Sequence, residues 1–383
     1  MIRILAWGII ATQLLLATRF LRQLFSTRHG KQISLSQATS GMTGSVTVVV
    51  PVLDEVDRVA DCLASLTRQD KSVAEVLVVD GGSSDGTRAL VANYAAADSR
   101  IRLIAADPVP KGWNGKAWGL DVGLRNSSET SRWIVTIDAD VRCAPTACAS
   151  AVRFADANRV PFLSLACNQV ASTRGLSLVH PSLLSTLVYR FGIPGHTARA
   201  IEEVQANGQF ALYERENLLR AGGFAIARGS ICEDVTLARH LFLSGYEVGF
   251  YEGPGLAETQ MYPDARTCLA NWPRSLALRD RFLSKAGRDG LANLVFLQLL
   301  PLLAAWWSPP GGATGRVFVG ANRALLACRI GILVGTRRAY SRVSWTYWLS
   351  PIFDPVSAIL YAWNLLRRTH TWRGRQLVDE EVS

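Results

Sequence analysis

The sequence predicts an α/β fold with a mainly parallel sheet, helices on both faces of that sheet, and membrane-associated helices at both ends of the chain. Between residues 45 and 286, continuous apolar segments alternate with helical ones, which is typical of parallel strands that are buried on both faces. Hydrophobic residues make up 49% of the chain. This share is high for a soluble enzyme but too low for a protein made only of membrane helices.

The amino-terminal apolar segment runs from Ile4 to Leu21, with Arg22, Arg28 and Lys31 behind it. Because no small-residue cleavage pattern follows, we expect an uncleaved anchor rather than a signal peptide. Basic residues that follow a span stay in the cytoplasm, so the amino end is expected outside. The segment is short for a span of about 20 residues, which leaves an interfacial helix open. Residues 30–44 are polar and predict a linker, so that 1–44 form an anchor and linker.

The central region, residues 45–286, has the pattern of alternating strands and helices. In parallel sheets of this type, ligands bind at the carboxyl ends of the strands. The expected strands are 46–52, 75–80, 100–106 and 133–140, and the expected helices include 57–67 and 87–97.

The carboxy-terminal region, residues 287–383, predicts membrane-associated helices and a basic tail. Arg323, Arg329 and Asp354 interrupt its apolar segments. Charges are unfavourable in lipid, so an interfacial helix or a broken helix that lines a protein-shielded site is expected. Three full spans would place the basic tail outside, against the charge rule, and the topology stays open. The three candidate segments are 291–307, 317–334 and 345–366.

The basic charge lies on the flanks of the chain. Residues 1–44 hold five Lys or Arg and no acids, residues 45–266 hold 21 bases and 25 acids, and residues 267–383 hold 15 bases and six acids. Basic flanks beside apolar segments indicate attraction to anionic lipids, whereas a nucleic-acid binder carries its bases on the folded domain. Tryptophans gathered toward the tail fit the aromatic belt of a membrane interface. We therefore expect a membrane partner and no nucleic acid.

The cysteines and histidines show no metal-binding pattern. The seven cysteines lack CxxC spacing, so reduced and mostly buried thiols in a cytoplasmic compartment are expected. The histidines at 180, 196, 240 and 370 are far apart in sequence and are expected to be structural rather than metal ligands.

Carboxylates follow three of the predicted strands: Asp54 with Glu55, Asp80, and Asp138 with Asp140. Asp is also a common turn former and helix cap, but three strand ends on one ligand-binding edge favour a site. In an extended segment Asp138 and Asp140 point to the same side. Two carboxylates in one cleft repel each other unless a cation is near, and Mg²⁺ or Mn²⁺ binds one or two carboxylates together with substrate phosphates. These residues therefore predict a diphosphate-metal site.

Other interpretations of these motifs remain open. An aspartic dyad that shares a proton is the alternative for the two aspartates, although it would not need Asp80 or Asp54. The run GGSSDGT at 81–87 is neither GxGxxG nor a Walker sequence. Lys111 and Lys116 either approach a diphosphate or face solvent beside a turn.

Several motifs, taken in order, resemble those of family 2 glycosyltransferases with the GT-A fold. They are VVVPVLDE (48–55), VVDGGSSDGT (78–87), IDAD (137–140), NGQFALYERENLLRAGGF (207–224) and CED (232–234), and the resemblance covers roughly residues 45–286. It implies a GT-A-type, Rossmann-like catalytic domain and a nucleotide-diphosphate sugar donor, with a UDP-sugar as the expected one.

The resemblance also implies roles for individual residues. Asp54 or Glu55 and Asp80 would lie near the nucleoside, and Asp138 near the ribose and diphosphate. Asp140, together with Asp138, would bind Mg²⁺ or Mn²⁺. Lys116 and Arg274 would contribute to donor binding. Asp234 would be the general base of an inverting displacement; for Glu233 and Asp234, charge complementarity at a helix start is the simpler alternative.

Two further features indicate which members of the family the chain resembles most. Processive synthases of the family carry Gln-x-x-Arg-Trp, whereas this chain reads NWPRSLALRDRF at 271–282, which argues against a synthase of long polymers. GWNGKAWGL (112–120), the Glu-Asp pair, NWPRS and the late TWRGR (371–375) are most similar to enzymes that glycosylate carotenoids and hopanoid-associated lipids.

The sequence thus favours a membrane-bound hexosyltransferase that acts on the hydroxyl of an isoprenoid lipid, such as a carotenoid, on the cytoplasmic side of the membrane. Two alternatives stay open. The acceptor could be a polyprenyl phosphate or a ceramide-like or glycerol-based lipid, or the chain could be a nonenzymatic membrane scaffold on a transferase fold.

Overall fold

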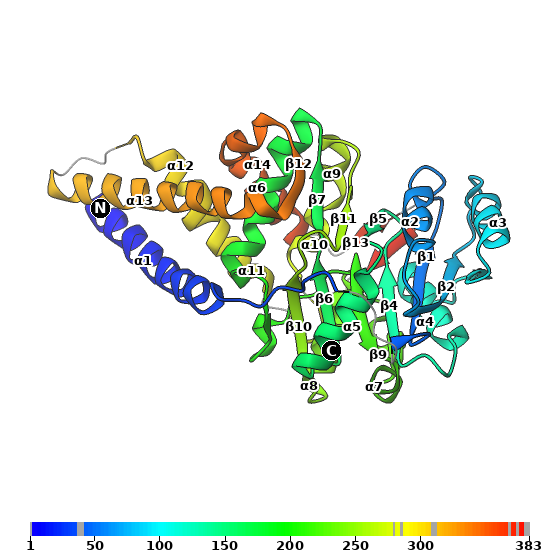
Figure 1. Cartoon of the computed structure of the whole chain (residues 1–383). Helices are drawn as coiled ribbons and strands as arrows, with labels where there is room; N and C mark the ends of the chain where they lie inside the picture. The colour runs from blue at the N-terminus through cyan, green and yellow to red at the C-terminus, as the bar shows by residue number, and fades with distance from the viewer. Residues whose placement is uncertain are drawn as a thin grey trace.

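The computed structural model describes residues 2–36, 42–278, 280–283, 286–307, 312–366, 369–372 and 375–378 of the 383-residue chain. In these residues a mixed eight-stranded sheet has the order β3-β2-β1-β4-β9-β6-β10-β8, and long helices project from one end of the molecule (Figure 1). β9 and β8 run antiparallel to their neighbours, and the other adjacent pairs are parallel. The mainly parallel α/β fold is therefore confirmed.

Most expected elements of the central region are present, with one difference at the site. The expected strand 46–52 and helix 87–97 have the observed bounds. The expected strand 133–140 is too long, because β4 ends at Ile137 and Asp138–Asp140 form a turn. The strands are β1 (Val46–Val52), β2 (Val73–Asp80), β3 (Ile101–Ala105), β4 (Trp133–Ile137), β6 (Phe162–Ala166), β8 (His196–Thr197), β9 (Phe210–Glu214) and β10 (Val248–Glu252). The helices are α2 (Val59–Leu66), α3 (Thr87–Ala97), α4 (Gly115–Asn126), α5 (Ala147–Asn158), α6 (Arg174–Phe191), η2 (Ile201–Glu203), α7 (Arg215–Arg220), η3 (Gly223–Ala227), α8 (Glu233–Leu243), α9 (Ala265–Asn271) and α10 (Pro273–Leu276).

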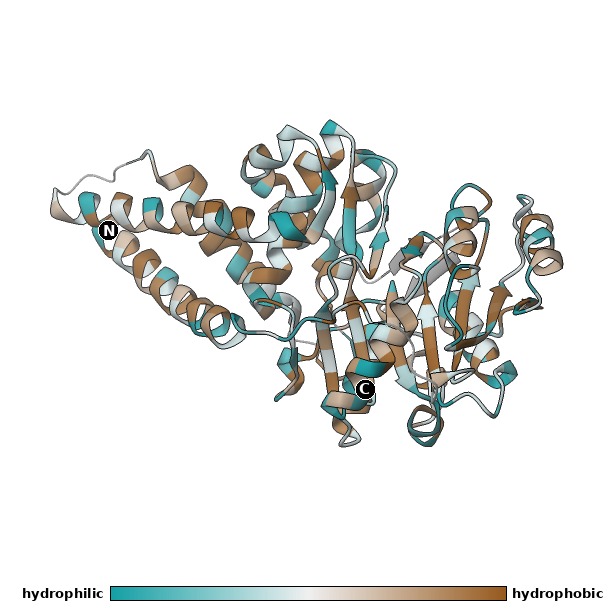
Figure 2. Cartoon of the chain, viewed as in Figure 1, coloured by the Kyte–Doolittle hydropathy of each residue, from teal (hydrophilic) through white to brown (hydrophobic). Residues whose placement is uncertain are grey.

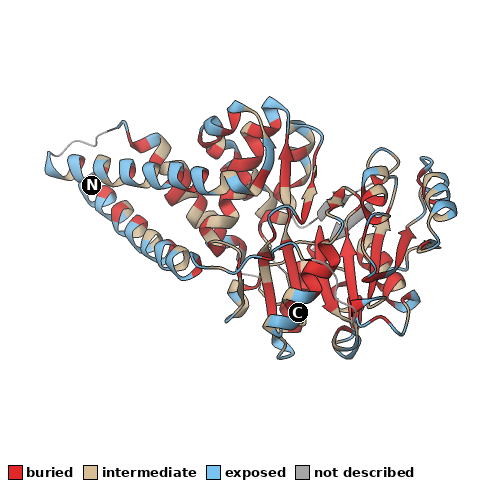
Figure 3. Cartoon of the chain, viewed as in Figure 1, coloured by how far each residue is buried: buried red, intermediate tan, exposed pale blue. Residues whose placement is uncertain are grey.

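Helices cover both faces of the sheet, which explains why its strands are continuously apolar. On β1, Val48 and Val50 belong to one buried cluster with residues of α2 and α5, whereas Val49 belongs to another with residues of α4 and α8. Figure 3 shows the strands as a buried layer between partly exposed helices.

A second, four-stranded sheet connects the carboxy-terminal region to the central one. Its order is β12-β7-β11-β5, and β12 pairs in parallel with β7. Beside it, Leu183 of α6 shares a buried cluster with Tyr347 and Tyr361. The strands are β5 (Val141–Cys143), β7 (Asn168–Ala171), β11 (Ala257–Thr259) and β12 (Tyr340–Val343).

Among the described residues, two helices have the length and apolar composition needed to cross a membrane. One is α1 (Ile2–Thr27), and the other comprises α13 (Ala313–Thr336) with the short helix η5 (Arg337–Ala339) after it. The 26 residues of α1 extend about 39 Å, so this helix is longer than the sequence suggested. Figure 2 shows apolar residues along both projecting helices.

The other two candidate spans are broken. One comprises α11 (Ala286–Asn293), the π-helix η4 (Leu294–Leu299) and α12 (Leu300–Ala304). The other consists of the 3-10 helix η6 (Trp345–Phe353) and α14 (Asp354–Leu366). The 13 residues of α14 extend about 20 Å, less than the roughly 30 Å of a hydrocarbon core. A two-stranded sheet of β13 (Thr369–Trp372) and β14 (Arg375–Val378) follows.

Of the three charges that interrupt the apolar segments, Arg329 and Asp354 are shielded by protein, as expected, whereas Arg323 is exposed. Arg329 of α13 forms a buried ion pair with Asp354 of α14, with Nε–Oδ2 at 2.8 Å and Nη2–Oδ1 at 3.0 Å. Ser182 of α6 also donates to Asp354. Together with Ser182, this ion pair links α6, α13 and α14.

The expected linker is more ordered than the sequence suggested. In the expected linker 30–44, the N–H of Lys31 donates to the carbonyl of Gly195, and the N–H of Ile33 donates to that of Glu252. Part of this segment therefore packs on the sheet.

Candidate active site

A cavity of about 990 Å³ opens at the carboxyl ends of the central strands and continues to the projecting helices. Six of the eight predicted site residues line it, although they come from distant parts of the sequence. They are Glu55, Lys116, Asp138, Asp140, Asp234 and Arg274. The sheet topology thus brings the predicted acids and bases together at one edge, as expected for ligand sites in α/β proteins.

Lys116 is the central cation of this cluster. Its Nζ lies 2.7 Å from Oδ1 of Asp138 and 3.0 Å from Oε1 of Glu233. Burial lowers the pKa of Lys116, but these two carboxylates outweigh that effect and hold the pKa well above its ordinary value. Asn114 caps α4 by accepting from the N–H of Lys116. Lys116 is therefore a fixed positive charge rather than a solvent-facing lysine.

The two aspartates of the DAD motif both face the cavity, from a turn rather than from the expected extended strand. Burial raises the pKa of Asp138 to about 6, the Lys116 ammonium opposes that rise, and Asp140 adds to it. Burial also raises the pKa of Asp140, against the effect of Arg58. The Nη1 of Arg58 is 3.9 Å from Oδ2 of Asp140.

This part of the cavity fits a divalent metal bound together with phosphates. Oδ1 of Asp140 is buried and has no hydrogen-bond partner among the described residues. This oxygen is therefore available to bind a hard divalent cation. Across those residues, no three His, Cys, Asp or Glu side chains form a ready metal cage. Mg²⁺ is commonly bound by one or two carboxylates with substrate phosphates and water, and Asp140 and Asp138 can supply those carboxylates.

Asp234 is held at the start of α8 by backbone groups. Its Oδ2 accepts from the N–H of Gly208 at 2.7 Å, and its Oδ1 accepts from the N–H of Val235 at 2.8 Å. Each carboxylate oxygen can accept a further hydrogen bond. Burial and the neighbouring charge of Glu233 raise the pKa of Asp234 to about 6. Asp234 therefore lies at a helix start, as expected if it only complements the charge of the helix terminus, but it also faces the cavity.

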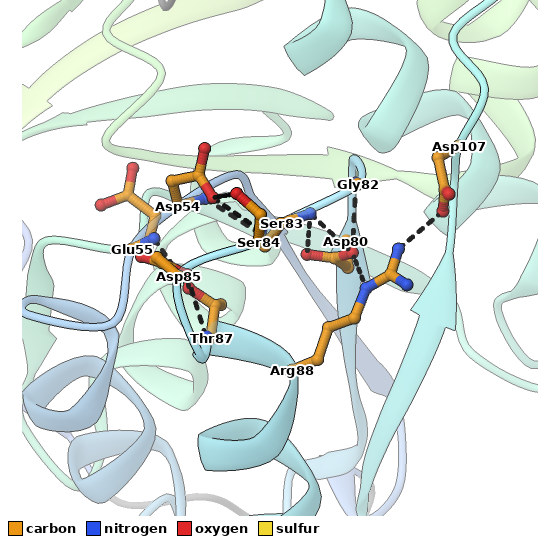
Figure 4. A network of polar contacts seen from close by, with 10 residues as sticks. All are labelled: Asp54, Glu55, Asp80, Gly82, Ser83, Ser84, Asp85, Thr87, Arg88 and Asp107. Atoms are coloured by element: carbon orange, nitrogen blue, oxygen red, sulfur yellow. Dashed lines mark hydrogen bonds and ion pairs between the residues drawn. The ribbon is translucent and has the colours of Figure 1, made fainter.

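Asp54 and Asp80 shape the loop beside the cavity and are absent from its described lining. Oδ1 of Asp54 accepts from the N–H of Ser84 at 2.8 Å. Asp80 accepts from the N–H groups of Gly82 and Ser83 and forms an ion pair with Arg88. Figure 4 shows these contacts within one network that fixes the GGSSDGT segment. The glycine-rich run is thus a tight turn tied to two strand ends.

The histidines have structural contacts. Nδ1 of His180 lies 2.7 Å from the hydroxyl of Tyr340, and its ring packs on Trp272 with centroids 4.3 Å apart. Burial lowers the pKa of His180 to about 3. His196 and His240 contact backbone carbonyls, and the side chain of His370 lies outside the described residues. The seven cysteines are free thiols, six of them buried.

Three contacts among the charged residues of the cavity were not predicted from the sequence. Glu233 anchors Lys116, the N–H of Gly208 anchors Asp234, and Arg58 pairs with Glu55 while lying near Asp140. The adjacency of Glu233 to Asp234 was a usable signal. Gly208 lies in the motif at 207–224, but its contact with Asp234 arises only on folding, and nothing in the local sequence marks Arg58.

Residues 47–193 match the model of the glycosyl transferase family 2. The matched region runs from β1 to just past the end of α6 and includes the DAD motif. Asp234 and Arg274 lie beyond the matched residues.

Curated relatives align with short parts of the chain. Glycosyltransferase AglE of Haloferax volcanii is 32% identical over 78 residues, which are 20% of this chain and 26% of that protein. The succinoglycan biosynthesis protein ExoO of Rhizobium meliloti is 34% identical over 112 residues, or 29% of this chain and 30% of that protein. The chain thus spans less than a third of the length of these relatives.

A solved structure matches nearly the whole fold. The mannosyltransferase PcManGT from Pyrobaculum calidifontis, in complex with GDP-Man and Mn2+, has a TM-score of 0.54 and 19% sequence identity. The match covers 95% of this chain and 99% of that one. At this identity the likeness establishes a shared GT-A architecture.

Proposed function

We propose that this chain is a membrane-bound inverting glycosyltransferase that moves a sugar from a nucleotide-diphosphate sugar, a UDP-sugar, to a hydroxyl of an isoprenoid lipid such as a carotenoid. One observation carries the proposal. A single cavity is lined both by the charged cluster around Lys116 and by the apolar faces of α1, α6 and α13. Such a cavity fits a polar donor at one end and an apolar acceptor at the other.

The geometry supports acid-base chemistry at Asp234. An acceptor hydroxyl is a poor nucleophile, so a carboxylate must remove its proton as the oxygen bonds to the anomeric carbon. The bond from that carbon to the diphosphate breaks, and the diphosphate leaves with the electron pair. Asp234 keeps the proton. Its anchoring by Gly208 and Val235 fixes the carboxylate before the acceptor arrives, which lowers the entropy lost in reaching the reactive geometry.

The donor end is proposed to hold the diphosphate near Asp138, Asp140, Lys116 and Arg274. A bound Mg²⁺ or Mn²⁺ would supply charge neutralisation for the leaving diphosphate. Lys116 holds Asp138 and Glu233 in place. Glu55 lines the same cavity and is proposed, with Asp54 and Asp80, to form or support the nucleoside end of the site. The family 2 domain match supports this assignment.

We also propose that the catalytic domain lies on the cytoplasmic side of the membrane. The amino ends of α1 and α13 lie together, whereas Arg28, Arg337 and Arg338 follow their carboxyl ends beside the catalytic domain (Figure 1). Basic residues favour the cytoplasmic side. Exposed tryptophans are found at both ends of the helical region, as in an interfacial belt: Trp7, Trp306 and Trp307 at one end, and Trp345, Trp348 and Trp363 at the other.

An acceptor that ends in a phosphate, such as a polyprenyl phosphate, is the second candidate. Arg28 and Arg338 line the cavity near the helices, where they could face an anionic group. A phosphate oxygen is already ionised and needs little help from a base, so the two candidates differ in their dependence on Asp234.

The deciding experiment is Asp234→Asn, with donor binding by calorimetry and transfer rate measured on one preparation. If Asp234 is the base, donor affinity is retained and transfer falls by about two to four orders of magnitude. Near-normal transfer would favour the phosphate acceptor, and parallel loss of binding and transfer would assign Asp234 to the donor site. Asp264→Asn is the matched control, because Asp264 caps α9 through Thr267. Mass spectrometry of lipid extracts from cells with and without the gene would identify the sugar and acceptor together.

A further inference from the structure

The cavity extends from Asp234 into a wedge between the projecting helices. Its wall beyond the charged cluster is formed by the carboxy-terminal ends of α1 and α13 and by the second half of α6. The lining residues of this part are Leu24 and Phe25 of α1, Leu184, Leu187 and Val188 of α6, and Gly331, Ile332 and Gly335 of α13. These residues carry no charge, in contrast to the cluster around Lys116.

The wedge arises because α1 and α13 diverge toward the catalytic domain. Near their amino ends the helices pack directly, with Ala6 and Ile10 against Phe318. Closer to the sheet, Phe20 and Ile332 share a cluster with Tyr189 of α6, so α6 fills the base of the gap. Figure 1 shows the two helices separating toward the sheet.

Two glycines make one wall of the wedge unusually open. Gly331 and Gly335 lie one turn apart on α13, on the same face of the helix, and both line the cavity. A Cβ built on either glycine would meet no atom within 4 Å. Room for side chains therefore exists along this wall without any change to the fold.

The charges around the wedge set its level in the membrane. Arg28 follows α1, Arg338 follows α13, and both line the cavity. Arginines at helix ends extend to the headgroup region while their neighbours stay in hydrocarbon. The glycine wall thus lies on the bilayer side of the arginines, and Asp234 lies in the catalytic domain beyond them. A chain that leaves the bilayer through the wedge therefore meets the apolar wall first and passes Arg28 and Arg338 before it reaches the charged cluster around Lys116.

We propose that the wedge between α1 and α13 binds the apolar chain of the acceptor, which enters laterally from the bilayer and lies against Gly331 and Gly335. This inference rests on the proposed function and adds the location and chemical class of the acceptor's tail: a long, narrow hydrocarbon chain with a terminal hydroxyl at Asp234. Continuity with the catalytic cavity selects this occupant over a protein segment, since a helix laid in the wedge would not deliver a reactive group to Asp234.

The test fills the wedge with Gly331→Leu and Gly335→Leu and uses Gly320→Leu as the matched control. Gly320 lies on the same helix, also faces open space, and is absent from the described lining of the cavity. Leucine favours helix relative to glycine, so all three variants are expected to fold. The acceptors are geranylgeraniol in detergent micelles and prenol, a short alcohol with the same hydroxyl end.

Gly331→Leu and Gly335→Leu should lower transfer to geranylgeraniol at least tenfold while leaving transfer to prenol and hydrolysis of the donor unchanged. Gly320→Leu should match the wild type. Equal activity of all variants toward geranylgeraniol, or an equal loss with both acceptors, would overturn the wedge site. A wild-type protein that neither transfers nor hydrolyses the nucleotide sugar would instead refute the proposed function.

A second measurement does not depend on turnover. Geranylgeraniol that carries a photoreactive diazirine should crosslink to peptides of α1, α6 or α13 that line the wedge, and Gly331→Leu should reduce that labelling at least several-fold. Labelling confined to the outer faces of the helices, or unchanged by Gly331→Leu, would exclude the wedge as the tail site. Labelling of a copurified protein segment in the wedge would do the same.

Discussion

The backbone N–H of Gly208 donates to Oδ2 of Asp234 across 2.7 Å, and the same glycine lies against the end of the Lys116 side chain. A Cβ at position 208 would be 2.7 Å from Nζ of Lys116 and 3.5 Å from Oδ2 of Asp234. One residue without a side chain thus lets the proposed base and the central cation approach each other.

Gly208→Ala should therefore displace Lys116 from its carboxylate partners. Since small misplacements in an active site reduce rates strongly, transfer is expected to fall about ten- to hundredfold, while the protein folds normally. Steady-state rates and a thermal melt on the same sample check this. Gly320→Ala, in open space on α13, is the control. Unchanged transfer in Gly208→Ala would show that the Lys116 position is unimportant.

The pH dependence of transfer should follow Asp234. Its pKa is raised to about 6 by burial and by Glu233, against the effect of Lys116. A base works only when deprotonated, so kcat/KM should fall as the pH drops through about 6. Glu233→Gln removes the neighbouring negative charge and should move this acid limb to lower pH. Surface Glu216→Gln should leave the limb in place, and an unmoved limb in Glu233→Gln would contradict the assignment.

Metal dependence should be lost in Asp140→Asn. A neutral amide cannot balance the charge of a divalent ion, so turnover with Mg²⁺ or Mn²⁺ should disappear while the melting temperature stays near that of the wild type. Asp107→Asn, which changes an acid of the neighbouring Arg88 network, serves as the control. Full activity of Asp140→Asn, or undiminished wild-type activity in excess chelator, would rule out the metal site.

The buried pair of Arg329 and Asp354 should be needed for stability. Breaking a buried ion pair on one side leaves an uncompensated charge and costs about 3–5 kcal/mol, so Arg329→Met should lower the melting temperature in detergent markedly. The double variant Arg329→Met with Asp354→Asn should recover much of the loss. Arg323→Met is the control, because Arg323 is exposed and its described contacts are with the carbonyl of Ala305 and the ring of Trp306. Equal melting of all variants would show that the pair is dispensable.

The sequence was sufficient to predict the sheet, because strands that are buried on both faces are apolar at every position. Every residue of the run Val46–Val50 is buried, so apolar residues occur without alternation. The end of β4 was missed for the same reason: Ile137 and Ala139 are both buried, and hydrophobicity does not mark the turn between them. Acidic residues at strand ends identified the cavity edge, since the carboxyl ends of parallel strands converge there.

Contacts between segments that are distant in the sequence could not be predicted from it. The pairing of Lys116 with Glu233 depends on the N-termini of α4 and α8 meeting, and neither local sequence specifies that meeting. Arg329 and Asp354 were recognised as unfavourable in lipid, but their pairing depends on the packing of α13 against α14. Asp54 and Asp80 were located correctly at strand ends, yet their oxygens are directed to the backbone and side chains of the next turn.

The position of β12 in the chain determines when the four-stranded sheet can form during synthesis. Its partner β7 is made early, with the catalytic sheet, but β12 itself follows both helices of the hairpin formed by α12 and α13. The four-stranded sheet therefore cannot close until that hairpin has been translated and residues 340–343 have left the ribosome. A chain cut short before this point keeps an open edge on β7, a surface prone to pairing with other chains. Completion of the four-stranded sheet thus reports that the long apolar helix α13 has already been made.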